Sequence, residues 1–145
     1  MNRTSIYEVD FYGWATEQAA LLREGRVAEA DLANIAEEID SMGRSEKREL
    51  INRLAVLITH LLKWRAQPAF RGNSWRLTVQ EQRRKLARHL DDNPSLRPTL
   101  NSTIADAYGD ALIEVQKQTG LPETAFPTAC PWTPEQVMAD GFLPG

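Results

Sequence analysis

Residues 50–64 read LINRLAVLITHLLKW, an unusually apolar run within this chain of 145 residues. One row at helical spacing holds Leu50, Leu54, Leu57 and Leu61, and other faces carry Ile51, Val56, Ile58 and Leu62. A helix that is apolar nearly all round is buried on most sides. The run therefore predicts a central helix that the other elements of the domain enclose.

The segments on both sides of this run repeat the 3.6-residue period of a helix, and no run alternates as a strand does. Helices are predicted from Tyr7 or Asp10 to Glu24, over residues 31–42, from Ser74 or Thr78 to Asp92, and over residues 94–119. Asp10 is suited to cap the first of them, while Gly25 and Gly120 are suited to end helices in the left-handed conformation. The second carries Leu32, Ile35, Ile39 and Met42 on one face. The apolar rhythm lapses near Gly43, so residues 31–66 form either one kinked helix or two collinear helices.

The last 25 residues, 121–145, are rich in proline but also carry Phe126, Trp132 and Phe142. Such a tail would be insoluble if it were free, so we expect it to pack back on the helices. Thr133, Pro134 and Gln136 predict one capped helical turn within it. The fold prediction is all-α: a single domain over residues 1–145, built as a bundle of about five main helices with a packed tail.

Composition is that of an ordinary globular protein, with 42% hydrophobic and 26% charged residues and a net charge of −3. The charge is uneven along the chain. Residues 51–100 hold 10 Lys and Arg against 3 Asp and Glu, whereas the flanking segments 1–50 and 101–145 are each acidic by five charges. Acidic and basic helices packed side by side explain this pattern, and so does a surface for an anionic partner. A pI near 5.4 favours the first explanation.

Cys130 is the single cysteine, which excludes an internal disulfide. We expect it to be a packed thiol and not a nucleophile, because no base is near it in the sequence. The opening residues MNRTSIYEVD contain no apolar leader, and Thr59 and His60 interrupt the longest apolar run. The sequence therefore predicts a cytoplasmic protein that does not enter a membrane.

The chain lacks phosphate loops, dinucleotide fingerprints, nucleophile elbows and paired-cysteine zinc patterns. No cofactor and no catalytic residue is predicted, and an enzyme is not favoured. The binding candidates are basic and aromatic residues around one helix connection: His60, Lys63, Trp64, Trp75, Arg76, Arg83, Arg84 and Arg88. Arginine stems commonly cover the edge of a core, so a structural role competes with a role in binding anions.

His60 lies in the most apolar helix, where a neutral ring bonded to a carboxylate or a backbone carbonyl is the ordinary arrangement. The alternative is a metal or acid-base site that combines His60 with Glu38, with Lys63 nearby. Metal-ligand spacing is missing around His60, so the structural role is favoured.

Seven phrases, together with a final FLP, form a specific set: YEVDFYGW, LLREGR, DLANIAEEIDSMGRSEKREL, HLLKW, SWRLTVQEQR, NPSL and TGLPETAFPTACPW. As a set, spanning Tyr7 to Pro144, they resemble the bacterial family catalogued as domain of unknown function twenty-nine. The resemblance implies an all-helical domain with no established activity, cofactor or catalytic residues.

The sequence leaves three functional hypotheses. The first is a protein interaction or regulatory module whose partner is a second copy or another protein, because residues 50–65 carry more apolar surface than one shallow bundle buries. The second is binding of nucleic acid or another anionic partner through the basic segment 63–97. The third, with the weakest support, is the metal or acid-base site around His60.

Overall fold

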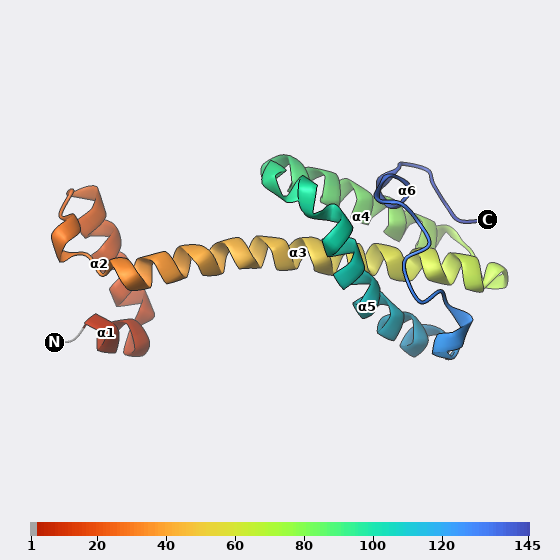
Figure 1. Cartoon of the computed structure of the whole chain (residues 1–145), viewed down its shortest axis with the longest axis horizontal. Coiled ribbons are helices and arrows are strands. Elements are labelled where there is room, and N and C mark those ends of the chain that lie inside the picture. The colour runs from red at the N-terminus through yellow and green to blue at the C-terminus, as the bar shows by residue number, and fades with distance from the viewer. Residues whose placement is uncertain (1–2) are drawn as a thin grey trace. The chain divides into compact units, whose positions relative to one another are not determined.

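The computed structural model describes residues 3–145, with side chains from Ile6 onward. Every regular element within these residues is helical. The α-helices are α1 (Arg3–Val9), α2 (Phe11–Arg23), α3 (Leu32–Ala66), α4 (Asn73–Asp92), α5 (Leu100–Thr119) and α6 (Pro134–Met138) (Figure 1). Short 3₁₀ helices lie at Val27–Glu29, Pro68–Phe70, Pro94–Thr99 and Glu123–Ala125. The all-α prediction is confirmed.

The chain divides into two compact units, of which the first ends at Ser45 and the second begins at Glu46. The boundary falls inside α3, which is one continuous helix of 35 residues. Gly43 has no positive φ and does not interrupt the helix. Of the two alternatives left open for residues 31–66, the structure has one helix, because a glycine and a lapse in apolar spacing do not by themselves end a helix.

The first unit holds α2 against the start of α3 through polar contacts. Asp10 caps α2 by accepting a hydrogen bond from the Gly13 N–H at 3.0 Å. Trp14 is buried, and its Nε1 donates to Asp31 Oδ2 at 3.0 Å. The Asp31 N–H donates to Gln18 Oε1 at 2.7 Å. These bonds fix the turn that follows Gly25, whose φ of +73° is left-handed as predicted.

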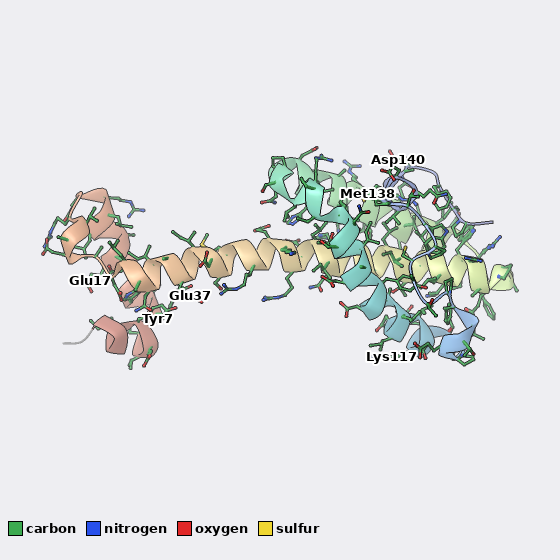
Figure 2. The ribbon with its side chains drawn as sticks, in the orientation of Figure 1. Tyr7, Glu17, Glu37, Lys117, Met138 and Asp140 are labelled. Carbon is green, nitrogen blue, oxygen red and sulfur yellow. The ribbon has the colours of Figure 1, made fainter. Side chains whose placement is uncertain are left out.

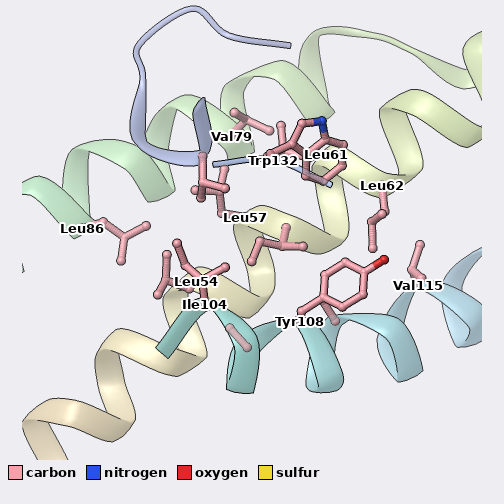
Figure 3. Close-up of a cluster of buried hydrophobic side chains, with 14 of the residues drawn as sticks. Leu54, Leu57, Leu61, Leu62, Val79, Leu86, Ile104, Tyr108, Val115 and Trp132 are labelled. Carbon is pink, nitrogen blue, oxygen red and sulfur yellow. The ribbon is translucent and has the colours of Figure 1, made fainter. Parts of the chain in front are cut away.

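The second unit encloses the C-terminal part of α3 (Figure 3). The leucine row predicted for the central helix, Leu50, Leu54, Leu57 and Leu61, is 0% exposed. Against it pack Val79, Leu86 and Leu90 of α4, and Ile104, Ala107, Tyr108, Ala111 and Val115 of α5. The central-helix prediction is confirmed.

The C-terminal tail packs on this core, as expected. Phe126 and Trp132 are buried, and Phe142 is partly buried against the same cluster. The Tyr108 hydroxyl donates to the Pro127 carbonyl. Thr133 and Gln136 form the predicted capping box at the start of α6. Among residues 3–145 no helix combines the length and the apolar character needed to cross a bilayer.

Candidate functional site

The connection between α3 and α4 is held by two cations stacked on two indoles. Lys63 Nζ lies 4.6 Å from the centre of the Trp75 ring and donates to Gln118 Oε1 at 2.9 Å. The Arg71 guanidinium lies 5.2 Å from the centre of the Trp64 ring. Lys63 thus joins α3 to both α4 and α5, and burial lowers its pKa. Cation–π contacts of this kind stabilise by about 0.5 to 2 kcal/mol.

Arg71 also ties this connection to the tail. Its Nε donates to the Trp64 carbonyl at 2.6 Å, and one terminal nitrogen donates to the Gly145 carbonyl at 2.7 Å. Lys63, Trp64, Arg71 and Trp75 are therefore engaged with one another and with neighbouring elements. This arrangement agrees with the structural interpretation of the connection.

Arg83 is the most buried charged side chain described, at 3% exposure. Its Nε donates to the Val137 carbonyl at 2.9 Å, and its terminal nitrogens donate to Phe142 at 2.7 Å and to Gln136 at 3.3 Å. Burial lowers the pKa of Arg83, and the Asp140 carboxylate, which lies beside α4 (Figure 2), offsets part of that effect. Because the tail covers its guanidinium, Arg83 presents little charge to solvent, and its place among the binding candidates stays a prediction.

The remaining arginines of α4 are exposed. Arg76 donates to Asn73 Oδ1 at 3.0 Å, and Arg84 and Arg88 lie on the solvent side of the helix. Arg76 and Arg84 line a cavity of about 610 Å³ between α4 and the tail. Arg83 lines the same cavity with its less buried atoms, and binding of an anion by these side chains stays a prediction.

His60 is half-buried on α3, and its Nδ1 lies 2.9 Å from the Val56 carbonyl. Burial lowers the pKa of His60; the bond to Val56 opposes this shift, and the charge of Lys63 adds to it. A backbone carbonyl partner and a lowered pKa fit the neutral structural histidine that the sequence favoured.

Glu38, suggested as a partner for His60, has a different neighbour in the first unit. The Tyr7 hydroxyl donates to Glu38 Oε1, and this bond raises the pKa of Tyr7 to about 12. Glu38 and His60 thus each form a hydrogen bond within their own unit.

Cys130 is partly buried against the core, and its thiol donates to the Trp132 carbonyl at 3.5 Å. Burial raises the pKa of Cys130. A protonated thiol is a poor nucleophile, so the packed role expected for Cys130 fits its surroundings.

One polar cluster in the second unit was not found by sequence reasoning. It consists of Glu46 and Glu49 on α3 and His89 on α4, with ligand atoms that lie within 4.8 Å of one another. The spacing Glu-x-x-Glu is visible in the sequence, but it is too common to single out. Only the packing of α4 on α3 shows that His89 meets both carboxylates.

Comparison with known proteins adds one result. The sequence model of the domain of unknown function DUF29 matches residues 6–143. The chain belongs to the DUF29 family. No curated protein and no solved structure gives a match. Membership in DUF29 confirms the resemblance carried by the seven phrases, and the family description assigns no activity, so a function has to be proposed from the structure.

Proposed function

We propose that this DUF29 protein is a protein interaction module that associates with a second copy of itself through its first unit. The observation that carries the proposal is an apolar row on the N-terminal half of α3 that lies in solvent. Leu32 is 51% exposed, Ile39 62% and Met42 68%, with Ile35 partly exposed between them. Their spacings of 3, 4 and 3 are those of the a and d positions along which paired helices pack.

The size of the first unit supports the same proposal. Within residues 6–45 the buried apolar side chains are Trp14, Leu21 and Ala30. Domains near 40 residues bury too little surface to be stable without disulfides, metals or association. A partner that covers the row would supply part of the missing burial, at roughly 25 cal/mol for each Å² of apolar surface.

A second copy is the partner that these residues suit. Antiparallel pairing of two identical rows sets Leu32 of one copy opposite Met42 of the other, with Ile35 opposite Ile39, and such a contact closes on itself. Residues 50–65 were the interface expected from sequence, but their leucine row is buried within the second unit, and Val56 is 40% exposed.

Sedimentation velocity over a concentration series tests the proposal. We expect the wild-type protein to populate a dimer and the Ile39→Glu variant to need at least tenfold higher concentration for the same dimer fraction, because a charge in an apolar interface costs more than about 1.4 kcal/mol. The matched control is Ile113→Glu on α5, where the native side chain is 63% exposed. This control should leave dimerisation unchanged.

Two outcomes contradict the proposal. One is a wild-type protein that sediments as a monomer at every concentration, and the other is a loss of the dimer in Ile113→Glu as large as in Ile39→Glu. Binding of an anionic partner through residues 63–97 has weaker support, because Lys63, Arg71 and Arg83 are engaged inside the protein.

A further inference from the structure

Two helices of the second unit place two carboxylates beside one imidazole. Glu46 and Glu49 are three residues apart on α3 and therefore share one face of the helix. His89 comes from the last turn of α4. The groove that they line has a volume of about 490 Å³. The cluster is separate from the apolar row of the first unit, so a role for these three residues does not depend on self-association.

The hydrogen bonding of His89 leaves one ring nitrogen available. The side chain is 9% exposed, and its Nε2 lies 2.8 Å from the backbone carbonyl of Glu46. The neutral ring carries its proton on Nε2 for that bond, so Nδ1 presents a lone pair. Within residues 6–145 Nδ1 has no hydrogen-bond partner, and the nearest carboxylate oxygen is Glu49 Oε2 at 3.9 Å. Donation of the second N–H to a backbone carbonyl is typical of histidines that bind metals.

The distance between His89 and Glu49 suits one shared ion. Zinc bonds to nitrogen and carboxylate oxygen are each about 2.0 to 2.2 Å, so two atoms that share one ion lie no more than about 4.2 Å apart. The separation of 3.9 Å between His89 Nδ1 and Glu49 Oε2 meets this limit. Glu46 Oε2 lies 3.6 Å from His89 Nε2, and its side chain is 49% exposed, so this carboxylate has to rotate to reach an ion on Nδ1.

Neighbouring cations do not occupy the atoms that would bind the ion. Arg53 donates to Glu49 through Oε1, at 2.8 and 3.1 Å, which leaves Oε2 for the ion. Lys85 pairs with Glu81 at 2.7 Å. Arg88 lines the groove, and Asp92 adds a further negative charge to it. Glu49 Oε2 thus lies near Nδ1 of the imidazole, and Glu46 Oε2 lies near Nε2.

We propose that Glu46, Glu49 and His89 bind a divalent cation of the zinc class between α3 and α4. A ligand set of one imidazole and two carboxylates suits Zn²⁺ and Co²⁺ better than Mg²⁺ or Ca²⁺, which take oxygen ligands. Three protein ligands leave a further coordination position open to water in the groove.

Isothermal titration calorimetry of the chelator-treated 145-residue chain with Zn²⁺ tests the site. The visible absorption of bound Co²⁺ reports the coordination geometry of the ion. We expect one ion per chain and a rise in melting temperature on binding. Glu46→Gln and Glu49→Gln should each weaken affinity at least about tenfold. Asp106→Asn, an exposed substitution on α5 away from the groove, is the control and should bind as the wild type does.

His89→Gln keeps a donor for the Glu46 carbonyl while it removes the nitrogen ligand, and it should lose the Co²⁺ absorption. Glu46→Gln guards against a folding defect, because it changes an exposed side chain and preserves its shape. A wild-type protein that takes up no Zn²⁺ or Co²⁺ overturns the proposal. Equal affinity of the Glu46→Gln, Glu49→Gln and wild-type proteins overturns it as well.

Discussion

Arg83 shows how one side chain fastens the tail to the helices. Its three hydrogen bonds go to backbone carbonyls of Gln136, Val137 and Phe142, and its guanidinium lies 6.0 Å from the centre of the Phe142 ring. The Gln136 carbonyl also accepts from the Ala139 N–H at 3.3 Å, so the Val137 and Phe142 carbonyls depend most on this donor once they leave water. A buried arginine supplies several donors from one position.

Replacement of this side chain should therefore destabilise the protein. We expect Arg83→Met to lower the free energy of unfolding by about 3 kcal/mol, because buried carbonyls lose their partners. Urea unfolding followed by circular dichroism measures the change. Arg84→Met, the adjacent and exposed residue, is the control and should change the free energy by no more than about 0.5 kcal/mol. Equal effects of the two substitutions would show that Arg83 does not hold the tail.

The C-terminus of α5 depends on a glycine in the left-handed backbone conformation. Gly120 follows its last residue with a φ of +73°, and its N–H donates to the Gln116 carbonyl at 2.9 Å. A residue with a Cβ is strained in this left-handed conformation. The same helix contains Gly109, which is exposed and where an added Cβ would meet no atom within 4 Å.

The two glycines should respond to alanine in opposite directions. Gly120→Ala should lower the free energy of unfolding by about 1 to 2 kcal/mol, the cost of the left-handed conformation. Gly109→Ala should raise it by about 0.5 to 1 kcal/mol, because alanine favours a helix interior. Thermal and urea denaturation of both variants check this pair. A destabilised Gly109→Ala would mean that this face of α5 is covered in solution.

The whole molecule consists of two units that differ in the depth of their cores. In the second unit the leucine row of α3 is fully buried, whereas the row from Leu32 to Met42 on the same helix is exposed. Backbone amides in exposed helices with few apolar contacts open more often than amides in a core. The two halves of α3 therefore allow amide exchange in an exposed and a buried segment to be compared within one helix.

Native-state hydrogen exchange should reveal this difference. At low protein concentration we expect amides of residues 33–44 to exchange at least about 100-fold faster than those of residues 50–62, which corresponds to about 2.7 kcal/mol in opening free energy. Raising the concentration should protect the first set through dimerisation and leave the second unchanged. Uniform protection along α3 would contradict this description, and it would support the single domain over residues 1–145, which stays a prediction.

The sequence predicted those structural features that depend on residues close together in the chain. The leucine row, the Asp10 and Thr133 caps, Gly25 and Gly120, and the apolar tail are all explained by spacing or backbone preference, and the structure agrees with each. Periodicity could not show that the row at Leu32 to Met42 is exposed, because it identifies an apolar face but not what covers that face.

The candidate sites were harder to predict, since they depend on contacts between distant segments. Arg83 resembles a solvated arginine on a helical wheel, and only the carbonyls of the tail reveal its role. His89 meets Glu46 and Glu49 through the register of α4 on α3, which spacing along the chain does not encode. The corner at Lys63 and Trp75 was recognised because its residues are near one another in sequence, although its partner Gln118 was not.

The reactivity of the Cys130 thiol depends on whether the tail is packed on the helices. The thiol is partly buried, donates to the Trp132 carbonyl and is the single cysteine of the chain. An alkylating reagent attacks the thiolate, and burial keeps that form scarce while the tail is in place. Alkylation is therefore faster in molecules whose tail has detached, so a rise in its rate under mild denaturation reports detachment without any engineered probe.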